Sequence, residues 1–131
     1  DAETFSEGLA AVKLGTGDNR YGYIDLQGIQ VVPPKYHSAD LFQKNRALVT
    51  HKRRRKTDRI IIDRTGKEYY RGPGEIKVLA SGFSVSEFLD RKGSCNNIRI
   101  TYRLILFDEN GNRRSYEVKT RKHSEFCLQA R

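Results

Sequence analysis

The sequence has no tryptophan and no methionine, only three prolines and two cysteines, and no long apolar run. No segment approaches the roughly 20 consecutive apolar residues that a membrane-spanning helix needs, so the sequence predicts no transmembrane segment. The chain opens on Asp1-Ala2-Glu3, without the charged and apolar regions of a secretory signal. Because methionine is absent, we expect a processed chain or a part of a longer parent protein that continues upstream.

The residue types that carry catalysis or bind metals form no recognisable pattern. His37, His51 and His123 lack the spacing of zinc ligands, and neither GxSxG nor GxxxxGK[ST] occurs. Cys95 and Cys127 lack CxxC spacing and could form one disulfide or none. We therefore expect no catalytic residue, no metal and no cofactor, and the sequence disfavours an enzyme.

The charge of the chain is strongly unbalanced. Lys and Arg number 25 against 16 Asp and Glu, which gives a net charge of +9. This excess favours anionic partners, whether nucleic acid, a membrane surface or polysaccharide, without selecting among them. Hydrophobic residues make up 37% and recur in short runs, so we expect a folded chain of 131 residues with a modest core.

A unit of about 37 residues recurs along the chain. Phe42 follows Phe5 by 37 residues, and the run 62–66 follows the run 24–28 by 38 residues. A third and fainter copy contains Gly82, which lies 74 residues after Gly8. We expect three units: 1–37, with the tail of a preceding unit at 1–4, then 38–74, then 75–131. The last is either a diverged capping unit or a separate β-domain.

Each copy contains short apolar runs separated by turn signals. In the first copy, the runs 9–14 and 21–25 flank a polar loop and predict a hairpin, and the run 29–32 adds a third strand. An Asp-x-x-Gly sequence joins the second and third runs. Its carboxylate can accept backbone hydrogen bonds, and its glycine allows a positive φ. We therefore expect structural turns at Asp25, Gly28, Asp63, Gly66, Asp108 and Gly111.

These patterns predict an all-β fold of antiparallel meander units in tandem, about three repeats of three strands. In the last copy, where the alternation is clearest, it predicts a strand with one buried and one mostly solvated face. The buried face would carry Ile98, Ile100, Tyr102, Leu104 and Leu106, and the solvated face Arg99, Thr101, Arg103 and Ile105. Little helix is expected, with single turns at 38–45 and 124–131.

The first copy resembles the WG repeat family, also called KWG, a bacterial β-rich repeat. The matching residues are Phe5, Glu7, Gly8, Leu9, Ala10, Val12, Gly22, Tyr23, Ile24, Asp25, Gly28, Val32, Pro33, Pro34 and Tyr36. Tyr21 stands where the family has its tryptophan, and Arg59-Ile60 stand at the Trp-Gly position of the second copy. The resemblance covers residues 1–70 clearly and 71–131 weakly.

The resemblance implies a bacterial protein, repeat arrays on surface, secreted or multidomain proteins, and no defined catalytic residues. We therefore expect a non-catalytic module for binding or scaffolding, with a protein or cell-envelope partner. A secreted or envelope location is favoured over the cytoplasm.

A basic run offers an alternative function. Clustered Lys and Arg release counterions from a polyanion, so this run could bind nucleic acid or another polyanion. The favoured interpretation is a solvated hairpin tip whose charges prevent aggregation. The residues are Lys52, Arg53, Arg54, Arg55, Lys56 and Arg59, and a second basic cluster contains Arg113, Arg114, Lys119, Arg121 and Lys122. The tyrosines could stack on a ligand, but in a β-repeat such residues more often pack in the core.

Overall fold

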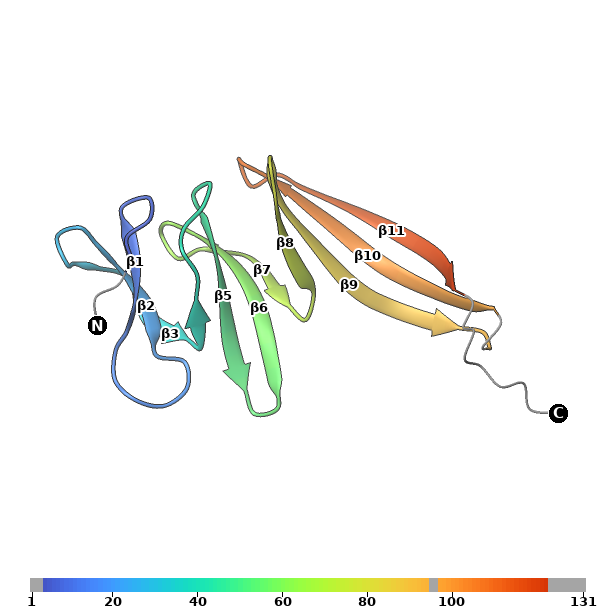
Figure 1. Cartoon of the computed structure of the whole chain (residues 1–131), viewed down its shortest axis with the longest axis horizontal. Helices are drawn as coiled ribbons and strands as arrows, with labels where there is room; N and C mark the ends of the chain where they lie inside the picture. The colour runs from blue at the N-terminus through green and yellow to red at the C-terminus, as the bar shows by residue number, and fades with distance from the viewer. Residues whose placement is uncertain (1–3, 95–96, 123–131) are drawn as a thin grey trace. The chain divides into compact units, whose positions relative to one another are not determined.

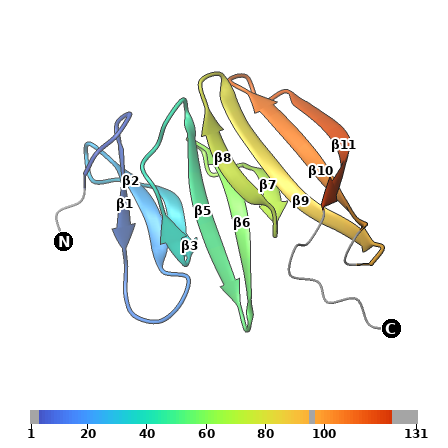
Figure 2. The same ribbon diagram turned by 45° about the vertical axis from the view of Figure 1, so that its right-hand side comes forward.

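The computed structural model describes residues 4–94 and 97–122, and three antiparallel sheets follow one another along the chain (Figures 1 and 2). All the regular elements in the described part are strands, which confirms the predicted all-β fold of tandem meander units. The chain divides into two compact units, Asp1–Pro73 with the first two sheets and Gly74–Arg131 with the third.

The strands of the first sheet are β1 Leu9–Lys13, β2 Tyr21–Asp25 and β3 Gln30–Tyr36, in the order β1-β2-β3. Those of the second sheet are β4 Ser38–Ala39, β5 Arg46–Arg53, β6 Lys56–Asp63 and β7 Glu68–Gly72, in the order β4-β5-β6-β7. Those of the third sheet are β8 Glu75–Leu79, β9 Gly82–Lys92, β10 Ile98–Asp108 and β11 Arg113–Lys122, in the order β11-β10-β9-β8.

All three sheets share one pairing scheme. In each sheet, a two-residue turn precedes a long hairpin. The residue after this turn begins the first strand of the hairpin, and it pairs with the aspartate that ends the second strand. Leu9 pairs with Asp25 in the first sheet, and Arg46 pairs with Asp63 in the second. Gly82 pairs with Asp108 in the third sheet. Gly82 therefore occupies the position of Leu9, one residue away from the alignment with Gly8 that the sequence suggested.

The second and third sheets each contain one strand more than the three expected, because the segment before the two-residue turn also pairs. Ser38–Ala39 pairs with β5, and Glu75–Leu79 pairs with β9. The helical turn expected at 38–45 is wrong, because Lys44 and Asn45 have positive φ values of 53° and 63°. The other expected turn, at 124–131, lies outside the described residues.

The burial expected for β10 is wrong at its C-terminal end. Ile105 and Phe107 are only 1% and 5% exposed, although Ile105 was expected on the solvated face. The register sets them beside Val85 and Phe83, which are also buried, so apolar side chains gather on that face. Alternation within one strand could not reveal these neighbours, since they come from β9.

The core of the first unit contains two of the repeated tyrosines. Tyr23 and Tyr36 are fully buried, and the Tyr23 ring meets Phe42 edge to face at 4.8 Å. The Tyr23 hydroxyl donates to the Asp40 carbonyl at 2.5 Å, and the Tyr36 hydroxyl donates to Glu68 at 3.0 Å. Burial, followed by the nearby carboxylates, raises the pKa of both hydroxyls. These tyrosines therefore pack in the core and are not available for stacking on a ligand.

The loops of the first repeat bind the backbone of the second. The Glu7 carboxylate accepts the amides of Lys44 and Asn45 at 2.7 and 2.9 Å. The Asn19 side chain exchanges two hydrogen bonds of 2.9 Å with the Lys52 backbone, beyond the point where β4 pairs with β5. Both contacts satisfy backbone groups that would otherwise lie unpaired at a turn or a strand edge.

Gly22 lies where the β3 backbone comes closest to β2. A Cβ atom at this position would lie 2.4 Å from the Val32 carbonyl oxygen and 2.9 Å from the Pro34 nitrogen. The register between β2 and β3 shifts here, which brings the Pro-Pro segment against the glycine. Ile60 occupies the same position in the second sheet, where it pairs in regular register with Arg71. The glycine is therefore required only in the repeat that has the Pro-Pro segment.

We predict that Gly22→Ala lowers the free energy of unfolding by about 1–3 kcal/mol, because the methyl group overlaps the β3 backbone. Urea denaturation measures this as a lower midpoint. Gly28 is the control, because its φ is +80° and a methyl group there would meet nothing within 4 Å. Gly28→Asn should recover the stability lost in Gly28→Ala, since asparagine tolerates left-handed backbone, whereas Gly22→Asn should remain destabilised. An unchanged midpoint for Gly22→Ala would contradict the close approach.

Candidate functional site

The expected Asp-x-x-Gly turns have the same hydrogen bonds in all three sheets. Asp25 Oδ1 accepts the amides of Gln27 and Ile29, both at 2.9 Å, while the Gly28 amide donates to the Asp25 carbonyl. The glycines have φ values of 80°, 90° and 85° at Gly28, Gly66 and Gly111. The corresponding acceptors are Asp63, which binds the amides of Thr65 and Lys67, and Asp108, which binds those of Asn110 and Asn112. These residues therefore fix the three turns.

The turn hydrogen bonds lower the pKa of two of these carboxylates. Burial alone would raise the pKa of Asp63, but bonds from the Thr65 hydroxyl and from backbone amides bring it below its usual value. The Asn112 side-chain amide, at 3.0 Å, is the main cause of the lowered pKa of Asp108. Both groups therefore favour the folded chain in their ionised forms.

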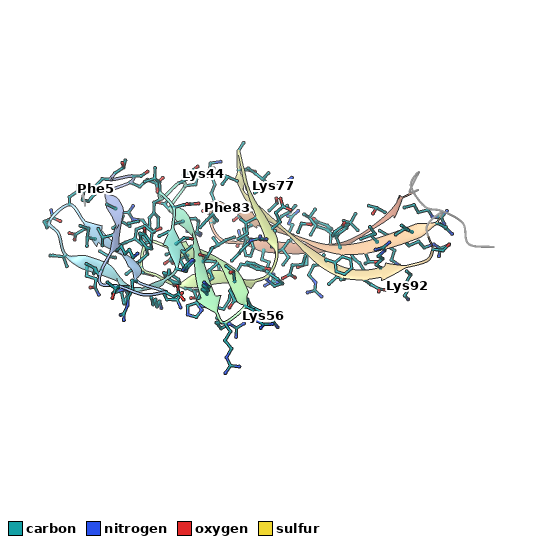
Figure 3. All side chains as sticks on the ribbon, turned by 60° about the horizontal axis from the view of Figure 1, so that its bottom comes forward. Phe5, Lys44, Lys56, Lys77, Phe83 and Lys92 are labelled. Carbon is teal, nitrogen blue, oxygen red and sulfur yellow. The ribbon has the colours of Figure 1, made fainter. Side chains whose placement is uncertain are left out.

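The first basic cluster lies at the tip of the β5–β6 hairpin, where Figure 3 labels Lys56. Its members point in different directions, because residues that alternate along a strand lie on opposite faces. Arg53 forms an ion pair with Asp58 at 3.2 Å, and Arg59 donates to the Pro73 carbonyl at 3.3 Å. Four members are exposed and form no ion pair within the described residues: Lys52, Arg54, Arg55 and Lys56.

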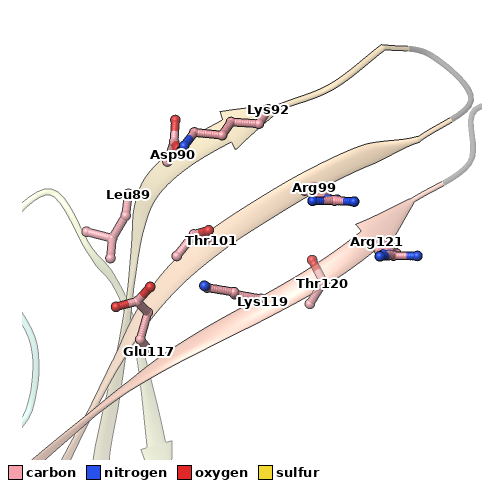
Figure 4. A pocket seen from close by; sticks show the side chains of 9 residues that line it. All are labelled: Leu89, Asp90, Lys92, Arg99, Thr101, Glu117, Lys119, Thr120 and Arg121. Carbon is pink, nitrogen blue, oxygen red and sulfur yellow. The ribbon is translucent and has the colours of Figure 1, made fainter.

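A groove of about 540 Å³ lies on one face of the β9–β10–β11 sheet (Figure 4). Four cationic side chains line this groove: Lys92, Arg99, Lys119 and Arg121. Two carboxylates also line it, Asp90 and Glu117, and Lys92 lies 3.7 Å from Asp90. We call this surface the cationic groove.

The sequence marked Lys119 and Arg121 but missed Lys92 and Arg99 as part of the same basic surface. The pairing register brings Arg99 opposite both Lys92 and Arg121. Arg114 belongs to the same sequence cluster but lies on the other face, because it pairs with Leu106. The useful signal was alternation in the two runs combined with their register, and the register cannot be read from one run.

The opposite face of this sheet exposes large apolar side chains. Phe88 is 61% exposed, Tyr116 46% and Val118 38%. Tyr102 pairs with both Phe88 and Val118, and its ring centroid lies 6.3 Å from that of Phe88. Leu104 is half-buried beside Tyr116. We call Phe88, Tyr102, Leu104, Tyr116 and Val118 the aromatic face.

The described residues contain no group of three His, Cys, Asp or Glu side chains that could hold a metal ion. Cys95 and Cys127 both lie outside the part of the chain that the structure describes, and so does His123. No helix in the described ranges is long and apolar enough to cross a membrane.

The repeated turns and shared pairing scheme define a β-repeat module. Residues 21–52 match the family model described as WG containing repeat, so the WG resemblance is confirmed for this segment. The match begins at β2 and ends in β5, and it therefore includes the connection from the first sheet to the second. No curated protein and no solved structure matches the chain.

We predict that Asp108→Asn destabilises the third sheet at neutral pH and that its difference from the wild type shrinks in acid. A lowered pKa in the folded state contributes stability above the unfolded value, which is about 3.9 for aspartate. That contribution is lost as the pH falls through the folded pKa. Urea midpoints from pH 7 to pH 2 test this. Glu109→Gln is the matched control, because Glu109 accepts no hydrogen bond from the described residues, and a similar pH profile for both variants would contradict the prediction.

Proposed function

We propose that this chain is a non-catalytic β-repeat module that binds or scaffolds a protein or a component of the cell envelope. The observation that carries the proposal is the aromatic face, where Phe88, Tyr116 and Val118 are exposed together. Monomeric proteins rarely leave such groups clustered in water, and clusters of this kind are typical of protein interaction sites. Tyrosine and phenylalanine contribute much contact area for little loss of side-chain entropy.

The two faces of the third sheet favour a partner with both apolar and anionic groups. The aromatic face offers contact area, while the cationic groove has four cations against two carboxylates. Secreted and cell-envelope partners fit this chemistry, since bacterial envelopes carry many anionic groups. Recognition by such surfaces requires no reaction chemistry of the module itself.

We predict that a photo-crosslinking residue at position 116 captures a discrete partner from lysate of the parent organism, whereas the same residue at position 26 does not. Leu26 is a suitable control because it is 69% exposed in the first unit. Phe88→Ser combined with Val118→Ser should abolish the capture at position 116, since the apolar contact is lost. Equal capture at both positions, or turnover of a substrate that a single substitution abolishes, would refute the proposal.

A second candidate function is polyanion binding by the β5–β6 tip. The supporting observation is that Lys52, Arg54, Arg55 and Lys56 are exposed without an ion pair within the described residues. Such side chains can approach phosphate or sulfate groups with little loss of existing interactions. Counterion release would make this binding strongly dependent on salt.

For this candidate, we predict that Arg54→Gln with Arg55→Gln weakens binding to heparin, DNA or RNA and reduces the slope of log K against log salt by about 2. The charge-matched control is Lys13→Gln with Lys77→Gln, because both lysines are exposed on other strands. Fluorescence anisotropy from 50 to about 300 mM salt measures the slope. Unchanged affinity in the tip variant removes this candidate.

A further inference from the structure

Strand β11 leaves a long edge of the third sheet unpaired. It pairs with β10 over ten residues and has no neighbour on its other side among the described residues (Figures 1 and 2). The residues 113–121 are all exposed. The opposite edge of this sheet, β8, has only five residues. An unpaired edge of this length is a template for a further strand.

The register identifies which backbone groups of β11 face outward. The Asp108 amide donates to the Asn112 carbonyl, so this pair is hydrogen-bonded. Hydrogen-bonded and non-bonded pairs alternate along an antiparallel ladder. The next pair, Phe107 with Arg113, is therefore non-bonded, and every second residue after it is too. The outward-facing amides and carbonyls belong to Arg113, Ser115, Glu117, Lys119 and Arg121.

The side chains of these same five residues lie on the face of the cationic groove. Three of them are cations, Arg113, Lys119 and Arg121, and one is the carboxylate Glu117. The residues between them include Tyr116 and Val118, which belong to the aromatic face. A strand added at this edge would therefore meet cations on one face and apolar side chains on the other.

We propose that β11 binds an extended acidic segment of a protein partner as a fifth, antiparallel strand of this sheet. The inference rests on the proposed function as a protein-binding module and names its partner's chemistry. The segment carries acidic residues opposite Arg121, Lys119 and Arg113, and a neutral or basic residue opposite Glu117. Apolar residues alternate with these and cover Tyr116 and Val118.

Charge disfavours a second copy of this chain as the occupant. Strand β11 has five cations and one carboxylate, so two such strands would repel each other. The same charges would also prevent non-specific pairing of other strands with this edge, as edge lysines do in many sheets. The two roles differ in outcome, because only the binding role predicts tight pairing with an acidic strand of the correct alternation.

The test uses the whole chain and the synthetic peptide Glu-Val-Glu-Val-Lys-Val-Thr-Val-Glu. Its control peptide has the same composition with the three glutamates adjacent. Anisotropy should show about tenfold weaker binding of the control, since its charges and apolar groups no longer match the two faces. On binding, hydrogen exchange should slow at the amides of Ser115, Glu117 and Lys119, which face outward in the free chain. Equal binding of both peptides, or unchanged exchange at these amides, would overturn the inference.

Ser115 provides a matched pair of variants. Ser115→Pro removes an outward amide that β10 does not use, and should weaken binding of the alternating peptide about tenfold by losing a hydrogen bond and adding a clash. Ser115→Ala keeps the amide and should bind as the wild type does. Thermal unfolding of both variants verifies that the sheet is intact, and protection of Leu104 and Leu106 amides in Ser115→Pro serves as a second check if its melting shifts.

Two further outcomes separate this inference from the function on which it rests. If Ser115→Pro still crosslinks its partner at position 116, the module binds protein by its aromatic face and the added strand is refuted. If sedimentation shows dimers that Ser115→Pro dissolves, the edge pairs with a second copy and the acidic partner is refuted. If the chain with the crosslinking residue at position 116 and no other change captures no partner, the proposed function is refuted. The hydrogen-exchange data alone then decide whether the peptide pairs with β11.

Discussion

A carboxylate that closes a turn on two backbone amides is the interaction on which the three sheets depend. At Asp25, Asp63 and Asp108 it fixes where the second strand of each hairpin ends and the third begins. Each aspartate then pairs with the residue that follows the preceding two-residue turn. This pair sets the register of the hairpin, whatever the length of the hairpin's strands. The third sheet could therefore lengthen its strands without changing the scheme.

The contacts between the first two sheets show which repeat residues are needed for assembly and which for local fit. The Glu7 carboxylate binds the turn of the next repeat. The corresponding residue of the second repeat is Lys44, whose side chain cannot accept backbone amides in this way. Gly22 is required only because the backbone of the Pro33-Pro34 segment comes very close to it. In the second sheet, where β7 pairs in regular register, Ile60 stands at the same position. At these two positions, the residue differs between the copies where its structural surroundings differ.

The third sheet combines three surface features. One face carries cations, the other exposes Phe88 and Tyr116, and the β11 edge presents unpaired backbone groups in line with both. Apolar contact supplies binding energy, charge selects and orients a partner, and backbone pairing fixes register. Under the proposed function, alternate positions of the one strand β11 therefore supply these three contributions: outward backbone groups and charges from one set of residues, and apolar side chains from the residues between them.

The sequence by itself determined most of the strands, the turns and the repeat, because period-two alternation and the Asp-x-x-Gly signal act over a few residues. It could not determine the extra strands β4 and β8, or that Ile105 would be buried, since both depend on partners distant along the chain. The sequence also gave no sign that Arg99 lies beside Arg121, because only the pairing of β10 with β11 brings these two residues together in the cationic groove. Local chemistry fixed the elements, and register, a property of two strands at once, decided which side chains share a surface.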